Sequence, residues 1–264
     1  MLAAQRRAVI LEQVRRDGAV RVAELTAALG VSDMTVRRDL EALGREGVIA
    51  KVHGGATRAA GRSSEEPGFE AKSVCELAEK HAVAKAAVAL VQPGQAVALG
   101  AGTTTHVLAQ HLLDIPDLTV ATNSVKIADV LRQRHTVVLT GGVRTPSDAL
   151  VGPVADLVLR SLHFDVTFLG CHGMDPVAGF TTPNLAESET NRAFVRACRS
   201  LVVTVDSTKY GTVGLVSFAA LDEADVLVTD DGLDADAQAT LAASVGRLVV
   251  APLDPPRSQH GTGA

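Results

Sequence analysis

The sequence contains no tryptophan and one tyrosine in 264 residues, so it offers no row of aromatic side chains on which single-stranded nucleic acid could stack. Its three cysteines, Cys75, Cys171 and Cys198, are odd in number, widely spaced and form no C-x-x-C pair. This arrangement argues against a disulfide framework and a thiolate zinc site. The amino terminus lacks the apolar core of a signal peptide, and no apolar run is long enough to span a membrane. We therefore expect a cytoplasmic protein without membrane contact, metal or cofactor.

Charge is distributed unevenly along the chain. Residues 1–58 hold ten Arg or Lys and seven Asp or Glu, whereas the remainder holds 15 basic and 23 acidic residues. A small basic module joined to a larger acidic one indicates that only the first part meets a polyanion. Hydrophobic residues make up 47% of the chain, so a sizeable core is available.

The first part of the chain, residues 1–57, predicts three short helices and a hairpin. The first two helices are expected over Ala3–Arg16 and Val22–Leu29, each followed by a glycine. Ser32 is a suitable N-cap for the third helix, which we expect to continue to about Arg45. Two short extended segments, V-I-A-K-V and A-T-R, flank the turn H-G-G.

The rest of the chain predicts a linker, a larger domain and a tail. Residues 58–71 have no periodicity and are rich in Gly, Ser, Pro and charge, which is typical of a linker, and 254–264 predict a flexible tail. Over 72–253, helix-like stretches separate most of seven short apolar runs, at 96–100, 118–122, 136–140, 166–170, 201–205, 226–229 and 248–251. Continuous apolar strands alternating with helices predict a mostly parallel sheet covered on both faces, and hence an α/β fold class.

The third helix predicts one buried and one free face. Counting about 100° per residue, Val36, Leu40 and Leu43 form a single apolar stripe, and Arg38 lies about 200° from Val36. Met34 and Thr35 project from the same free side in the first two turns, while Arg37 lies on the flank. In a helix-turn-helix, Arg38 could reach a guanine edge, Met34 or Thr35 a thymine methyl, and Arg37 a phosphate. The alternative is a solvated helix face with incidental charges.

The amino-terminal run V-R-V-A-E-L-T-A-A-L-G-V-S-D-M-T-V-R-R-D-L-E-A-L-G-R-E-G-V-I-A-K-V-H-G-G-A resembles the signature of the DeoR family of bacterial transcriptional regulators. The resemblance implies a winged helix-turn-helix that places the third helix in the major groove of a double-stranded DNA operator, with H-G-G-A as the wing. Many members have arginine before the wing turn, where this chain has Lys51, which keeps a phosphate contact but loses bidentate geometry. The candidate DNA-binding residues are Ser32, Met34, Thr35, Arg37, Arg38, Lys51, His53, Gly54 and Gly55.

In the larger domain, small polar or glycine-rich clusters follow five of the apolar runs. They are G-A-G-T-T-T (100–105), T-N-S (122–124), T-G-G (140–142), G-C-H-G-M-D (170–175) and D-S-T-K (206–209). The carboxyl ends of parallel strands form the ligand crevice of an open sheet. The first cluster precedes a helical run, so its backbone N–H groups and hydroxyls could hold an anion such as phosphate. It lacks the lysine of a P-loop, which disfavours a nucleotide triphosphatase.

These clusters, with E-S-E-T-N-R and D-S-T-K-Y-G, also resemble the DeoR-type sensor domain, whose fold is similar to that of ribose-5-phosphate isomerase and whose usual effectors are phosphorylated sugars. By this likeness Thr103–Thr105 would hold the phosphate, and the other residues would line the same crevice. The candidate effector-binding residues are Gly100, Gly102, Thr103, Thr104, Thr105, Asn123, Ser124, Gly141, Gly142, His172, Asp175, Thr181, Thr182, Glu187, Asp206 and Lys209.

The sequence therefore predicts a DNA-binding transcriptional regulator rather than an enzyme. We expect a repressor of carbohydrate metabolism genes, acting as a homo-oligomer, dimer or tetramer, whose operator affinity is modulated by a phosphorylated sugar. The alternative is a sugar-phosphate isomerase-like enzyme fused to a DNA-binding module, in which Asp175 and Lys209 would supply a base and an acid. Because a DNA-binding module is fused to the domain, binding of the ligand without conversion is a sufficient role, which favours the regulator.

Overall fold

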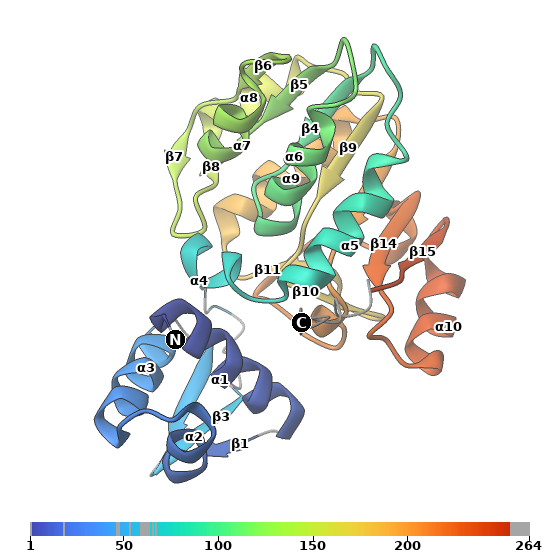
Figure 1. The fold of residues 1–264 in the computed structure, drawn as a ribbon. Helices are drawn as coiled ribbons and strands as arrows, with labels where there is room; N and C mark the ends of the chain where they lie inside the picture. The colour runs from blue at the N-terminus through green and yellow to red at the C-terminus, as the bar shows by residue number, and fades with distance from the viewer. Residues whose placement is uncertain are drawn as a thin grey trace, which may run out of the picture.

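The structure is a computed structural model that describes residues 2–17, 19–45, 48–52, 54–58, 64, 66 and 68–253. It has a small amino-terminal module next to a larger α/β domain (Figure 1). The fold class predicted from the sequence is confirmed. Within the described residues, no helix is long and apolar enough to cross a membrane. The predicted tail, 254–264, lies outside the described residues.

The small module, which we call the DNA-binding module after the function that the sequence predicts for it, consists of three helices and a three-stranded antiparallel sheet. Its elements are α1 (Ala3–Asp17), β1 (Ala19–Arg21), α2 (Val22–Leu29), α3 (Asp33–Arg45), β2 (Ile49–Val52) and β3 (Gly55–Arg58), with strand order β1-β3-β2. The three helices and the β2–β3 hairpin follow the prediction, but β1 was not predicted because three residues are too few for a periodic pattern. Gly55 packs against β1, where an added Cβ would lie 2.0 Å from the Val20 carbonyl oxygen.

Local signals set the turn between α2 and α3. Gly30 ends α2 in the left-handed conformation, at φ 63°, and its N–H donates to the Thr26 carbonyl. Ser32 then caps α3, because the Thr35 N–H donates to the Ser32 hydroxyl at 3.3 Å. These two residues fix the angle between α2 and α3.

A buried carboxylate joins α1 to α3. Asp39 is 3% exposed and accepts hydrogen bonds from the Arg6 Nε at 2.8 Å and the Arg7 Nε at 3.4 Å. Two of the basic residues of the module therefore stabilise its interior, so the charge available for DNA is smaller than the residue count suggests.

The larger domain is built on a seven-stranded, fully parallel sheet. Its strands are β4 (Ala96–Leu99), β5 (Thr119–Thr122), β6 (Thr136–Leu139), β9 (Val166–Leu169), β12 (Leu201–Thr204), β14 (Val226–Asp230) and β15 (Leu248–Ala251). The spatial order is β15-β14-β12-β9-β4-β5-β6. Each of the seven apolar runs singled out in the sequence forms one of these strands.

Helices cover both faces of the sheet, as the apolar character of the strands requires. One apolar cluster joins the strands to α5 (Leu77–Val88), α6 (Thr103–Leu112) and α7 (Val125–Leu131). The other joins them to α8 (Pro153–Arg160), α9 (Leu185–Ala197) and α10 (Ala235–Ser244). A short helix, α4 (Phe69–Ser73), begins inside the segment that the sequence predicts to be linker.

Short antiparallel pairs and turns complete the domain and were not predicted, because their strands have two to four residues. They are the hairpin β7 (Val143–Arg144) and β8 (Leu150–Val151), the sheet of β10 (Gly173–Asp175), β11 (Gly179–Thr182) and β13 (Val216–Ala219), and the 3-10 turns η1 (Ser207–Lys209) and η2 (Leu221–Glu223).

The order of the parallel strands reverses between β4 and β9. From β4 the chain proceeds to β5 and β6 in one direction, and from β9 it proceeds to β12, β14 and β15 in the other. The connections on the two sides of this point leave in opposite directions and open a crevice at the carboxyl ends of the central strands. A ligand site is therefore expected beside β4 and β9.

The buried carboxylate of Asp39 predicts a stability difference between two aspartates of α3. Asp39→Asn should lower the free energy of unfolding of the DNA-binding module by about 2 kcal/mol, because charged hydrogen bonds to two arginines are lost. Asp33→Asn removes an exposed ion pair with Arg37 and should cost well under 1 kcal/mol. Urea unfolding followed by circular dichroism measures both, and equal losses would contradict the buried role of Asp39.

Candidate functional site

The free face of α3 is oriented as the sequence predicts. Val36, Leu40 and Leu43 are buried in the module, whereas Met34 is 69% exposed and Arg38 is exposed. In Figure 1, α3 lies on the side of the module away from the larger domain. The amino-terminal turns of α3 are therefore accessible to a large partner such as a DNA groove.

The flanking basic residues are paired with acids in the free protein. The Arg37 Nε lies 2.5 Å from an oxygen of Asp33, and the Lys51 ammonium lies 3.2 Å from Glu41. All four side chains are at least half exposed, so these pairs are weak and can exchange for phosphate contacts. On DNA binding, Arg37 and Lys51 would either contact a phosphate and their acidic partner together or leave that partner for the phosphate.

Some of the other predicted DNA contacts have structural roles in the module. The Ser32 and Thr35 hydroxyls lie 2.9 Å apart and bond to each other at the start of α3. Gly54 adopts φ 77° in the turn of the hairpin, and Gly55 is buried against β1. His53 lies outside the described residues.

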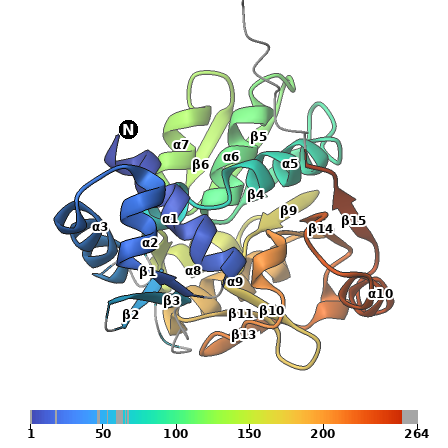
Figure 2. The same cartoon turned by 60° about the horizontal axis from the view of Figure 1, so that its bottom comes forward.

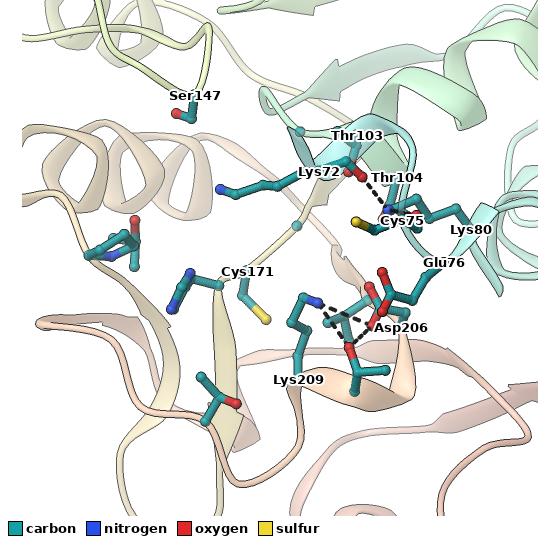
Figure 3. A pocket seen from close by; sticks show the side chains of 18 of the residues that line it. Lys72, Cys75, Glu76, Lys80, Thr103, Thr104, Ser147, Cys171, Asp206 and Lys209 are labelled. Atoms are coloured by element: carbon teal, nitrogen blue, oxygen red, sulfur yellow. Dashed lines mark hydrogen bonds and ion pairs between the residues drawn. The ribbon is translucent and has the colours of Figure 1, made fainter. Parts of the chain in front are cut away.

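A cavity of about 540 Å³ lies where the strand order reverses (Figure 3). Its walls include the ends of four neighbouring strands: Gly102–Thr104 after β4, Asn123 after β5, 170–172 after β9, and 204–206 with Thr208 and Lys209 around the end of β12. Of the predicted effector residues, it is lined by Gly102, Thr103, Thr104, Asn123, His172, Thr182, Glu187, Asp206 and Lys209. The prediction that the strand-end clusters meet in one place is thus met for four of the five.

Seven predicted effector residues are not among those that line the cavity: Gly100, Thr105, Ser124, Gly141, Gly142, Asp175 and Thr181. Gly100 and Gly142 permit close packing, since an added Cβ would lie 2.5 Å from the Leu169 side chain and 2.6 Å from the Val151 carbonyl oxygen. Ser124 caps α7. Gly141 has a positive φ, 72°, in the T-G-G turn that follows β6.

The other residues outside the cavity lining are committed to their own backbone. The Thr105 hydroxyl donates to the Gly102 carbonyl, and the Thr181 hydroxyl donates to the Gly173 carbonyl. The Asp175 carboxylate accepts the N–H groups of Val177 and Ala178 in the turn after β10. Asp175 and Lys209 therefore do not form the acid–base pair that the isomerase alternative requires.

Two lysines that the sequence did not single out line the cavity. The Lys72 ammonium has no hydrogen-bond partner within the described part of the chain, and burial lowers its pKa. In Figure 3 the Lys72 side chain extends into the cavity. A half-buried ammonium without a hydrogen-bond partner is stabilised by an anionic ligand.

Lys80 enters the cavity wall from α5, and burial also lowers its pKa. Its ammonium donates to the carbonyl oxygens of Lys72, at 2.7 Å, and of Cys75. The sequence did hold a signal for Lys80, because it shares a buried helical stripe with Val83, Ala84 and Ala87. Lys72 had none, since it precedes the first strand of the sheet.

Asp206 and Lys209 form a pair at the end of β12. The Lys209 ammonium lies 3.3 Å from an Asp206 oxygen, which also accepts the Thr208 hydroxyl. Burial alone would raise the pKa of Asp206, but the Lys209 charge, the Thr208 hydrogen bond and Lys80 together lower it. Asp206 is therefore ionised at neutral pH and holds Lys209 at the cavity.

A polar corner faces these lysines. Glu187 on α9 accepts hydrogen bonds from the hydroxyls of Thr145, at 2.9 Å, of Thr182, at 3.0 Å, and of Ser147. Burial raises its pKa, as does the nearby Glu66. Glu66 in turn accepts the Ser147 N–H and the Asn184 side-chain amide. This corner offers carboxylate and hydroxyl oxygens suited to the hydroxyl groups of a polar ligand.

The two sides of the cavity have complementary chemistry. One side has the Lys72 ammonium and the first turn of α6, whose early N–H groups lack intrahelical partners and attract anions. The other has the hydrogen-bonding corner around Glu187. Among the described residues, no group of three His, Cys, Asp or Glu side chains could hold a metal ion. The arrangement suits a small ligand with an anionic end and several hydroxyl groups.

The fold and the two sites indicate a class of protein: a DNA-binding regulator with a helix-turn-helix module and a larger α/β domain that has a ligand-sized cavity. The family description "DeoR-like helix-turn-helix domain" matches residues 6–61, and "DeoR C terminal sensor domain" matches residues 76–231. The chain belongs to the DeoR family of transcriptional regulators.

Relatives match nearly the whole chain. The uncharacterized HTH-type transcriptional regulator YgbI of Escherichia coli K12 is 40% identical over 95% of this chain and 99% of its own. The putative aga operon transcriptional repressor of E. coli O157:H7 is 35% identical over 88% of each chain. The lactose phosphotransferase system repressor of Staphylococcus aureus is 32% identical over 84% of this chain and 89% of its own.

Among solved structures, ribose 5-phosphate isomerase A of Methanocaldococcus jannaschii resembles the chain at a TM-score of 0.38 and 19% identity, over 50% of this chain and 53% of that one. A likeness of this size says nothing about activity.

The geometry of α3 predicts different roles for its two neighbouring arginines. Arg38→Ala should reduce discrimination between preferred and random sites by about 1–3 kcal/mol, because a base contact is lost. Arg37→Ala should weaken binding to all sequences and reduce the slope of log affinity against log salt by about 1, because a phosphate contact is lost. Selection from a randomised duplex pool followed by salt titrations measures both, and identical behaviour of the two variants would contradict the assignment.

Proposed function

We propose that this protein is a repressor of carbohydrate metabolism genes whose operator affinity is set by a phosphorylated sugar in the cavity. The names of two relatives, the aga operon repressor and the lactose phosphotransferase system repressor, support a role in sugar metabolism. The carrying observation is the unpartnered ammonium of Lys72 in a cavity that also holds the start of α6 and the Glu187 corner. A phosphate fits the first side and sugar hydroxyls fit the second.

We further propose that the ligand is bound and not converted. Acid–base catalysis of isomerisation needs a group within reach of the proton it moves. The carboxylate that the sequence offered, Asp175, is held in a surface turn by Val177 and Ala178, and Glu187 is held by three hydroxyls. A chromatographic assay for isomer formation tests this proposal, and protein-dependent conversion of any sugar phosphate would overturn it.

The active form is proposed to be a homo-oligomer, a dimer or a tetramer. One winged helix reads few base pairs, and operator affinities of the usual range need two or more half-sites. A sugar phosphate would then shift the oligomer between geometries that bind the operator with different affinity. Sedimentation with and without operator DNA tests the stoichiometry.

The cavity chemistry predicts which ligands stabilise the protein. Phosphorylated sugars and sugar alcohols should raise the melting temperature in a thermal-shift panel, whereas the same sugars without phosphate should not. Lys72→Met should weaken binding about tenfold to a hundredfold, because one charged hydrogen bond is lost. Lys85→Met is the control, since Lys85 is exposed on α5 and is not among the cavity-lining residues. Equal effects of the two variants would contradict the Lys72 site.

The same site predicts how binding depends on pH. Burial, Lys72 and Lys209 lower the pKa of His172 to about 4, so this side chain stays neutral above pH 5 and adds no charge. A phosphate monoester gains its second charge near pH 6, so its affinity should rise roughly fourfold from pH 5.5 to 7.5. At higher pH the affinity should fall again as Lys72 loses its proton. Because burial lowers the pKa of Lys72, this fall should begin at a lower pH than for an ordinary lysine. Calorimetric titrations test this, and affinity that rises on acidification would contradict it.

A further inference from the structure

We propose that the DNA-binding module forms one wall of the effector cavity, and that ligand binding in the cavity opposes the docking of the module. This inference concerns regulation of the same cavity and rests on the proposed sensing function. Three observations support it: the residues that line the cavity, the position of Cys75, and the hydrogen bonds of Lys80.

The cavity is lined by residues of both parts of the chain. Leu11 and Val14 of α1, and Val48 next to β2, line it together with Lys72 and Asp206 of the larger domain. Figures 1 and 2 both place α1 between α3 and the larger domain. The module is therefore in contact with the volume that the ligand would occupy.

Cys75 belongs to the apolar core of the DNA-binding module. It is 8% exposed, and it packs in the same cluster as Ile10, Leu11 and Val14, although it follows α4 in the larger domain. Its thiol donates to the Ala71 carbonyl. The segment between α4 and α5 is thus buried on one side by the module and borders the cavity on the other.

The Lys80 ammonium holds this segment in an unusual conformation. It donates to the carbonyl oxygens of Lys72, in the last turn of α4, and of Cys75, within the α4–α5 turn. The residue after Cys75, Glu76, has a left-handed backbone conformation at φ 45° and ψ 45°, which residues other than glycine rarely adopt. The positive charge of Lys80 thus stabilises the turn that presents Cys75 to the module.

An anionic ligand competes for this charge. Lys80 lines the cavity, and its ammonium has a third N–H besides the two that donate to carbonyl oxygens, so a phosphate bound there draws the ammonium toward itself and weakens both of those hydrogen bonds. The α4–α5 turn is then held less firmly, and so is the surface on which α1 rests. By linkage, the same coupling makes docking of the module weaken ligand binding.

The reactivity of Cys75 reports the docked state in the full-length protein. Brief alkylation with N-ethylmaleimide, followed by peptide mass spectrometry, measures the rate at Cys75, and half-buried Cys198 serves as an internal reference. Saturating inorganic phosphate should speed alkylation of Cys75 at least threefold relative to chloride at equal ionic strength, and leave Cys198 unchanged. Calorimetry on the same samples establishes whether phosphate is bound.

Two valines of the module provide a matched pair that needs no ligand. Val48→Asp introduces a carboxylate at the cavity wall and should raise the Cys75 rate at least tenfold without phosphate. Val52→Asp makes the same change on β2 at a residue that is 48% exposed and is not among the cavity-lining residues, and should stay within twofold of the parent. Circular dichroism melts show whether each module is folded; if Val48→Asp is not, the phosphate experiment on the unmodified protein decides.

The outcomes separate this inference from the proposed function. Bound phosphate with an unchanged or slower Cys75 rate overturns the inference and leaves the sensing function in place. Absence of phosphate binding counts against the proposed phosphate site. In that case, equal Cys75 alkylation rates in the two folded valine variants overturn the inference that the docked module forms a wall of the cavity. A faster rate in Val48→Asp alone supports it.

Discussion

The reversal of strand order between β4 and β9 is the constraint on which the ligand site depends. Parallel strands require crossover helices, and where the crossovers on the two sides of a point leave in opposite directions nothing fills the space above the strand ends. In this chain the ends of β12, β9, β4 and β5 all border that space. Segments about 100 residues apart in sequence, such as Gly102–Thr104 and 204–209, therefore share one cavity without any local signal that joins them.

Charge within this cavity is nearly balanced. Three lysines, Lys72, Lys80 and Lys209, face the carboxylates Glu76, Glu187 and Asp206. Buried charges are costly unless they are paired, so a site with equal numbers of both signs can exist without ligand. Under the proposed function, a dianionic phosphate would use an ammonium that has no hydrogen-bond acceptor or share one that already donates to backbone carbonyls. Lys72 would be the first case, with a role in affinity, and Lys80 the second, with a role in the response.

The sequence predicted more of the fold than of the site. The seven strands and α2 follow from apolar runs and glycine stops, which are local properties. The strand-end clusters located the cavity, but could not show which polar atoms face it: Thr105, Ser124, Asp175 and Thr181 satisfy nearby backbone groups instead. Residues that reach the cavity from outside the sheet were missed for a different reason. Lys72, Cys75 and the α1 residues enter it only because the two domains pack together, and no periodicity encodes that packing.

This sharing of residues has a consequence for how sugar and operator affect each other. Lys72 and Cys75 lie three residues apart on one short segment, one lining the ligand site alone and the other also belonging to the core of the DNA-binding module. A shift of this segment therefore changes contacts both in the cavity and in the core of the DNA-binding module, since packed interiors shift as units. The proposed coupling is reciprocal by linkage: DNA that fixes the module in a new position would change the sugar affinity by the same factor as the sugar would change the operator affinity. A sensor built in this way needs no long pathway between its two sites, because a single turn between α4 and α5 belongs to both.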